Sequence, residues 1–234
     1  MKRSLYLLAV LFVLASCQKE VGFDTPPGSG GSGGGGGTGT GGGGTLPDTY
    51  QPVTKDSYWK YKDSAFTGLI TLMTATGQQK TINSKIYQVI KSETTGQPVA
   101  EGYFYTAKPI YGLRQDVNNG IATTIEFTYL NDTASVGYKW TENMAPVNGN
   151  PARFHGTIME RNISKTVAGK NFTNVIHTQL LLEYELPFFG WTEFAVYNYY
   201  VAKGIGIIRI ETEFTAFGQT GFRTVSDLID YSIK

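Results

Sequence analysis

The side chains that could bind a metal ion are few in this 234-residue chain. It contains two histidines, His155 and His177, and a single cysteine, Cys17. Tetrahedral zinc needs three or four converging ligands, and neither histidine has a second one two or four residues away. A lone histidine on the polar side of a strand is usually solvated. The sequence therefore predicts no metal site, and nothing in it requires a cofactor.

Catalytic chemistry would have to come from carboxylates. Glycoside hydrolases use two carboxyl groups about 5–10 Å apart, and four glutamates lie on neighbouring predicted strands: Glu183, Glu193, Glu211 and Glu213. A solvated strand face accounts for the same residues. Serines are abundant, but none lies in the strand–turn–helix elbow that a nucleophilic serine needs. We therefore predict that the protein is not an enzyme and keep a glycan hydrolase as the least favoured alternative.

Aromatic side chains are the richer signal for binding. They make up 13% of the chain, and the run Tyr197-Asn198-Tyr199-Tyr200 would place rings on both faces of one strand. One face must be core, whereas the other could stack on a sugar or hold an apolar ligand. A second buried layer, or aromatic pairs across a curved sheet, would explain the same run. The candidate ligand-binding residues are Trp191, Tyr197, Tyr199 and Tyr200.

The elements that would position these residues are strands. Between residues 47 and 234, apolar and polar residues alternate in many short runs, for example 121–129, 176–184 and 225–233. Such alternation is typical of antiparallel strands with one buried face. Turn signals such as Thr76-Gly77 separate the runs. We expect one all-β domain over residues 47–234, built as a single curved antiparallel sheet or half-barrel of about ten strands.

The first residues of the chain have the organisation of a secretory signal. Lys2 and Arg3 are followed by an apolar run over residues 5–14, which is too short to span a bilayer core of ~30 Å as a helix. The stretch Leu14-Ala15-Ser16-Cys17 resembles the lipobox of bacterial lipoproteins. That resemblance implies cleavage before Cys17 and attachment of a diacylglyceryl group to its thiol. We therefore expect a signal peptide at residues 1–16 and a membrane anchor at Cys17.

A glycine tract separates the expected anchor from the domain. Of the 29 glycines in the chain, 13 lie between Gly28 and Gly44. Glycine-rich chain behaves as a flexible coil, so residues 17–46 are expected to be a disordered tether that reaches about 100 Å when extended at ~3.3–3.6 Å per residue. The tract imitates glycine motifs of nucleophile elbows and nucleotide-binding loops, but these need a preceding strand and a following helix.

The net charge of +1 excludes a strongly basic nucleic-acid binder.

Three segments of the domain resemble segments of uncharacterised lipoproteins from the Bacteroidetes. They are Tyr50-Gln51-Pro52 followed by Ser57-Tyr58-Trp59-Lys60-Tyr61, then Gly169-Lys170-Asn171-Phe172-Thr173-Asn174-Val175-Ile176, and Tyr199-Tyr200-Val201-Ala202-Lys203-Gly204-Ile205-Gly206-Ile207-Ile208. This resemblance implies a curved antiparallel sheet akin to lipoprotein-carrier or lipocalin-like half-barrels, and it implies no catalytic residue. Asp63-Ser64-Ala65 and Asp132-Thr133-Ala134 are similar to the short O-glycosylation pattern of these bacteria, which makes Ser64 and Thr133 candidate modification sites.

Together these observations favour a membrane-tethered, non-catalytic binding module for an apolar molecule or a glycan. A structural or protein-interaction component of the cell envelope is the alternative. Gln18, and not aspartate, follows Cys17, so the inner-membrane retention signal of enteric bacteria is absent. We therefore expect the outer membrane, on its periplasmic or its surface side. The expected partners are the membrane and one such ligand, with no nucleic acid and with the oligomeric state left open.

Overall fold

The computed structural model describes residues 47–65, 69–118, 122–147, 149–216 and 219–234. The expected signal peptide, the anchor at Cys17 and the tether lie outside the described residues. Residues Leu46–Lys234 form a compact unit of their own, which holds every strand and all the buried apolar residues of the described chain. This unit therefore has what an independently folding domain needs. None of the described residues belongs to a helix with the length and apolar character that crossing a bilayer requires.

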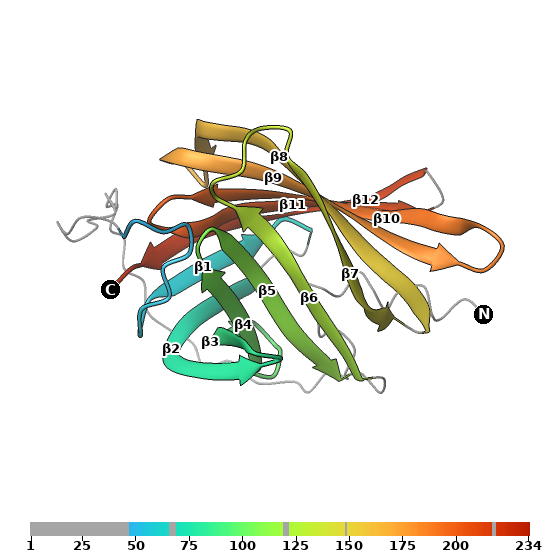
Figure 1. Cartoon of the computed structure of the whole chain (residues 1–234). Coiled ribbons are helices and arrows are strands. Elements are labelled where there is room, and N and C mark those ends of the chain that lie inside the picture. The colour runs from blue at the N-terminus through green and yellow to red at the C-terminus, as the bar shows by residue number, and fades with distance from the viewer. Residues whose placement is uncertain (1–46, 66–68, 119–121, 148, 217–218) are drawn as a thin grey trace, which may run out of the picture. The chain divides into compact units, whose positions relative to one another are not determined.

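Twelve strands make up the described chain. They are β1 (Tyr58–Asp63), β2 (Ile70–Ile82), β3 (Lys85–Thr94), β4 (Ala100–Ala107), β5 (Ile110–Asn118), β6 (Ala122–Asn131), β7 (Lys139–Val147), β8 (Asn150–Val167), β9 (Lys170–Leu186), β10 (Gly190–Ala202), β11 (Gly206–Ala216) and β12 (Gln219–Ser232). All belong to one antiparallel sheet (Figure 1), which confirms the expected fold class. The expectation of about ten strands is too low. Strand lengths range from 6 to 18 residues, and a short strand shows too little alternation to be counted from the sequence.

The two ends of the domain lie in the middle of the sheet, and the middle of the chain forms its edges. The strand order is β6-β5-β4-β3-β2-β1-β12-β11-β10-β9-β8-β7. Consecutive strands are therefore neighbours throughout, except that β1 pairs with β12 and that β6 and β7 are the two edges. The sheet twists and rolls up until these edges approach each other (Figure 1). The result is a nearly closed, barrel-like rolled sheet.

Alternating burial along β9 agrees with the alternation in its sequence. In β9, Ile176, Leu180 and Leu182 are completely buried, whereas His177 and Glu183 are only partly covered. Successive side chains of a strand point to opposite faces of the sheet. The apolar side of β9 therefore faces the inside of the roll, and its polar side lies on the outer surface.

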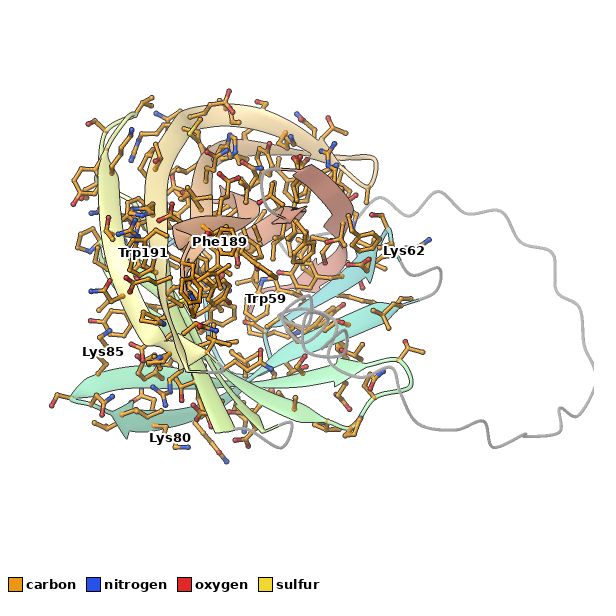
Figure 2. The ribbon with its side chains drawn as sticks, turned by 90° about the vertical axis from the view of Figure 1, so that its right-hand side faces the viewer. Trp59, Lys62, Lys80, Lys85, Phe189 and Trp191 are labelled. Carbon is orange, nitrogen blue, oxygen red and sulfur yellow. The ribbon has the colours of Figure 1, made fainter. Side chains whose placement is uncertain are left out.

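Aromatic rings fill the inside of the rolled sheet. Trp59, Phe104, Tyr129 and Tyr199 are at most 2% exposed, and neighbouring rings have centroid distances of 5.8 to 6.4 Å. Trp59 lies deep in the roll (Figure 2) and donates its indole N–H to the Ile205 carbonyl at 2.6 Å, so its polar group is not left unpaired. Because these rings come from strands in both halves of the sheet, their packing holds the roll together.

Residues 47–52, here called the plug, precede β1 and pack into the aromatic core. Tyr50 and Gln51 are 6% and 2% exposed. The Tyr50 N–H donates to the Tyr111 hydroxyl at 3.4 Å, and the Tyr129 hydroxyl donates to Gln51 Oε1 at 3.2 Å. The Thr49 carbonyl accepts the N–H of Gly204, in the turn between β10 and β11, at 2.7 Å. The chain therefore enters the domain beside that turn.

One predicted turn is a β-bulge instead. Thr76-Gly77 lies inside β2, where the register with β3 shifts between Ala75 and Gln79. Gly77 has a φ of +76°, a conformation that glycine adopts without steric cost and that serves a bulge as well as a turn. A glycine signal in a sequence of this kind therefore does not by itself separate two strands.

Candidate functional site

The two edges of the sheet meet by overlap. Phe127 of β6 faces the core, 4.7 Å from Phe154 between ring centroids, so its neighbours Glu126 and Thr128 point to the outer face. On β7, Glu142 is the cross-strand partner of the same inward-facing Phe154, so it lies on the inner face. The inner face of β7 therefore covers the outer face of β6.

A side chain joins the two edges where backbone pairing is absent. The Glu142 carboxylate accepts the Thr128 N–H at 2.6 Å and the Thr128 hydroxyl at 2.6 Å. An edge strand presents unpaired N–H groups, and here the carboxylate occupies the place that a carbonyl of a neighbouring strand would take. We call this pair of contacts the Glu142 latch.

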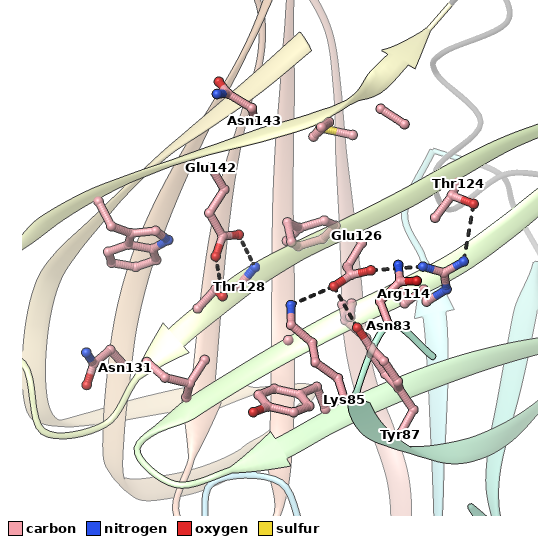
Figure 3. A pocket seen from close by; sticks show the side chains of 18 of the residues that line it. Asn83, Lys85, Tyr87, Arg114, Thr124, Glu126, Thr128, Asn131, Glu142 and Asn143 are labelled. Carbon is pink, nitrogen blue, oxygen red and sulfur yellow. Dashed lines mark hydrogen bonds and ion pairs between the residues drawn. The ribbon is translucent and has the colours of Figure 1, made fainter. Parts of the chain in front are cut away.

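Beneath β7 lies a groove of about 780 Å³, here called the β7 groove and shown in Figure 3. Its size falls in the range typical of small-molecule sites. The floor comes from β3 to β6 and the roof from β7. The polar and aromatic side chains of the floor include Lys85, Tyr87, Tyr105, Arg114, Glu126 and Thr128, and those of the roof are Tyr138, Trp140, Glu142 and Asn143.

Glu126 organises the floor of the groove. Its carboxylate accepts hydrogen bonds from Lys85 at 2.7 Å, Tyr87 at 2.6 Å and Arg114 at 2.9 Å (Figure 3). Burial acts to raise the pKa of Glu126, but these three donors outweigh it and hold the pKa below its usual value. Burial and the Glu126 carboxylate both raise the pKa of Tyr87. The Glu126 carboxylate is therefore held in its ionised form by the donors around it.

The roof presents a stacked aromatic pair. The rings of Tyr138 and Trp140 lie 6.0 Å apart and are inclined by 26°. The indole lies flat against Gly156, the cross-strand partner of Trp140, so closely that a Cβ added at Gly156 would be 2.1 Å from the ring. Glycine at this position therefore leaves the space in which Trp140 lies.

Two N–H groups of the lining have no hydrogen-bond acceptor among the described residues. They are Arg114 Nε on the floor and Trp140 Nε1 on the roof, and both are buried. The charges of the lining balance, because Lys85 and Arg114 are offset by Glu126 and Glu142. The groove thus combines unpaired donors, an aromatic face and no net charge.

The structure separates the four aromatic residues that the sequence singled out. Tyr197 and Tyr199 lie side by side in the core, at 3% and 1% exposure, and the Tyr197 hydroxyl has no hydrogen-bond partner in the described chain. Tyr200 points the other way and stacks on His177 at 4.4 Å. Trp191 is 37% exposed. The four do not form one surface, and their role in ligand binding stays a prediction.

The glutamates that the sequence singled out lie on the outer face of β9 to β11. Glu183 accepts hydrogen bonds from Arg153 at 2.7 Å and His155 at 2.9 Å. Burial acts to raise its pKa, but these two partners lower it. Glu211 pairs with two arginines in the same way. Glu193 and Glu213 lie on the neighbouring strands opposite Glu183 and Arg223 respectively. Within the described ranges, no three His, Cys, Asp or Glu side chains converge as metal ligands would.

Both candidate modification sites lie at the surface. Ser64 is exposed just after β1, and its hydroxyl accepts the Val225 N–H at 3.0 Å. Thr133 is exposed between β6 and β7, and its hydroxyl donates to Asn131 Oδ1 at 3.1 Å. O-glycosylation of either residue stays a prediction.

The sequence analysis did not identify the β7 groove. The alternation in Tyr138-Lys139-Trp140-Thr141-Glu142 would have marked a strand with two aromatic residues and a glutamate on one face. That this face covers β6 follows from the closure of the sheet, which leaves no local pattern in the sequence.

Comparisons with known proteins support the fold. No protein-family model matches the sequence, and no curated protein matches it. A solved structure from Parabacteroides distasonis, described as a "putative lipoprotein", aligns with a TM-score of 0.51 at 10% identity, over 79% of this chain and 99% of that one. Another from Bacteroides fragilis, described as a "putative exported protein" with a YmcC-like fold, aligns with a TM-score of 0.47 at 8% identity, over 80% and 100%. The first likeness shows a shared fold, whereas the lipobox and a lipocalin-like relationship stay predictions.

Proposed function

We propose that this chain is a lipoprotein of the cell envelope, anchored in the outer membrane through Cys17, and that its β domain binds a neutral glycan segment in the β7 groove. The binding is non-catalytic. The signal and the resemblance to a lipobox support the anchor, and a shared fold with a protein described as a "putative lipoprotein" is consistent with it.

The two unpaired donors of the groove carry the glycan assignment. A buried N–H without an acceptor costs about 1–3 kcal/mol, and here two of them belong to side chains that line one groove, Arg114 and Trp140. A glycan is rich in hydroxyl and ring oxygens that accept hydrogen bonds. Its flat apolar face also matches the stacked Tyr138–Trp140 pair.

The charges of the lining select among ligand classes. An apolar molecule would strip water from Lys85, Glu126 and Glu142 without replacing its hydrogen bonds, which is unfavourable. A strongly anionic ligand would meet as many anions as cations in this lining. A neutral, oxygen-rich ligand has neither cost. This favours the glycan over the apolar molecule as the ligand of the module.

The bonding of the two groove carboxylates supports binding without hydrolysis. A glycosidase needs one carboxylic acid with a raised pKa that gives a proton to the leaving group. The pKa of Glu126 is lowered by its three donors, so it stays ionised at neutral pH. Both oxygens of Glu142 are taken up by Thr128.

The test measures glycan binding by the mature chain, residues 17–234, with Cys17→Ser so that no acyl group is attached. The labelled chain is applied to an array of neutral and acidic oligosaccharides, and affinities are then measured by calorimetry. We expect binding to neutral members and a loss of about twofold to tenfold for Trp140→Ala, since an aromatic stacking contact contributes roughly 0.5–1.5 kcal/mol.

Two further variants sharpen this test. Trp191→Ala removes an exposed tryptophan outside the groove and should leave the affinity unchanged. Gly156→Ala changes no lining group but forces the indole to move, so it should weaken binding as Trp140→Ala does. The proposal fails if no glycan binds, or if Trp140→Ala and Trp191→Ala have the same effect.

A further inference from the structure

The tip of the β9–β10 hairpin, residues 187–191, exposes large apolar side chains. Phe188 is 104% exposed, as much as in an isolated peptide, and Phe189 is 70% exposed. Phe188 also has a φ of +71°, which a bulky residue rarely adopts. Backbone strain and exposure of an aromatic ring are both costs, and neither is offset within the domain at Phe188. Contact with an apolar surface outside the domain would offset the cost of exposing the ring.

The exposure of the aromatic side chains falls from the tip of this hairpin towards β10. The two phenylalanines are at its tip, and Trp191 follows at the start of β10. The Arg153 guanidinium lies over the face of the Trp191 ring, 3.9 Å from the ring centroid. In a bilayer, phenylalanine lies at the acyl boundary, whereas tryptophan and arginine lie at the headgroup level. The order along the hairpin therefore matches the order of a lipid interface.

Charge around the tip distinguishes between lipid surfaces. Glu185 and Glu193 flank it and are exposed, and the charge of Arg153 is taken up by Glu183 at 2.7 Å. The surroundings of the tip are thus acidic on balance and would be repelled by anionic lipids. The geometry fits a zwitterionic surface, which attracts the tip through apolar burial alone.

The chain enters the domain at the end opposite the hairpin tip, and this does not prevent the tip from touching a membrane. The plug is bonded to Gly204, at the opposite end of the 13-residue strand β10 from the tip, a separation of about 43 Å at ~3.3 Å per residue. The 30 residues from Cys17 to Leu46 reach about 100 Å when extended. An anchor at Cys17 therefore permits the far end of the domain to touch the same membrane. In Figure 1 the orange hairpin extends to the right-hand end of the rolled sheet, and Figure 2 views that end.

We infer that the hairpin tip inserts Phe188 and Phe189 into the interface of a zwitterionic lipid bilayer, as a second membrane contact beside the expected anchor. This contact holds the domain with the plug end raised. It does not depend on the ligand of the β7 groove.

The experiment uses the mature chain with Cys17→Ser, so that binding cannot come from an acyl chain. It is mixed with vesicles of phosphatidylcholine and phosphatidylethanolamine that contain brominated phosphatidylcholine, and it is followed by co-sedimentation and tryptophan quenching. We expect co-sedimentation that is insensitive to salt, together with quenching of Trp191. Phe188→Ser with Phe189→Ser should lower the partition coefficient on the order of a hundredfold, about tenfold for each ring.

Control variants assign the effect to the tip. Val99→Ser with Val136→Ser removes two apolar side chains that are 59% and 58% exposed elsewhere and should leave partitioning unchanged. Trp191→Phe should abolish most of the quenching but keep the sedimentation. The inference is overturned if the chain does not sediment, if the tip variant partitions like the Val99/Val136 variant, or if phosphatidylglycerol strengthens binding. It is also overturned if the tip variant changes only the oligomeric state of the chain without vesicles.

Discussion

At the scale of single residues, Glu126 is the side chain on which most of the groove floor depends. Its two oxygens accept from a lysine, a tyrosine and an arginine that come from three different positions on β3 and β5. Removing its charge leaves Arg114 with a single carboxylate partner, Asp116. We expect Glu126→Gln to destabilise the domain by about 1–3 kcal/mol at pH 7, measured by urea denaturation.

The same substitution should change the dependence of stability on pH. Because the pKa of Glu126 in the folded protein is below its ordinary 4.5, its contribution is fully present above pH 4.5 and is lost as the pH falls through the lowered value. The difference between wild type and Glu126→Gln should therefore shrink between pH 5 and pH 3. Glu93→Gln is the control, because the Lys91–Glu93 pair is about half exposed and such pairs contribute little. Equal denaturation midpoints for the two variants at pH 7 would contradict this role.

The sequence predicted which face of the sheet a side chain lies on better than it predicted which residues that side chain contacts. The rows around Ile176 and Leu180 point inward as their alternation indicates, and His177 lies on the outer surface. The partners of Glu126 lie up to 41 residues away in the chain. Such contacts depend on strand register, which no local pattern specifies.

At the scale of elements, the Glu142 latch replaces a strand pairing. We expect Glu142→Ala to speed amide hydrogen exchange at Thr128 by on the order of tenfold to a hundredfold, because the N–H loses its acceptor. Glu142→Gln keeps one acceptor oxygen and should restore part of the protection. Glu93→Ala, far from the latch, should have no effect. Unchanged exchange in Glu142→Ala would show that another group protects this amide.

Strands were easier to predict than their ends. Alternation over residues 121–129 predicted β6, whose Ile125, Phe127 and Tyr129 are all buried. The row over residues 225–233 predicted the strand β12 but not its buried face, because the register with β1 shifts at Ile229 and the completely buried side chain is Leu228. Thr76-Gly77 was predicted as a turn but forms a bulge inside β2, since a positive φ serves both. The overlap of β7 on β6, and with it the groove, follows from the curvature of the whole sheet and could not be predicted from any one strand.

At the scale of the whole molecule, the plug fixes the closed roll. Tyr50 is 6% exposed and packs edge-on against Tyr111, with ring centroids 6.4 Å apart. We expect Tyr50→Ala to lower the free energy of unfolding by about 3 kcal/mol, as for other buried aromatic rings. Tyr138→Ala, at a site that is 45% exposed, should cost less than about 1 kcal/mol. Thermal denaturation of both variants measures the difference, and similar melting temperatures would mean that the plug contributes little.

The pairing of β1 with β12 also sets an order for assembly of the sheet. Tyr58 lies opposite Ser232, so β1 has only β2 beside it until β12 is in place. All other pairings join consecutive strands, and such local hairpins form early. The two half-sheets, β1 to β6 and β7 to β12, therefore become one sheet only when β12 pairs with β1. A chain interrupted before β12 would carry the central strand β1 as an unpaired edge, which is open to pairing with another chain.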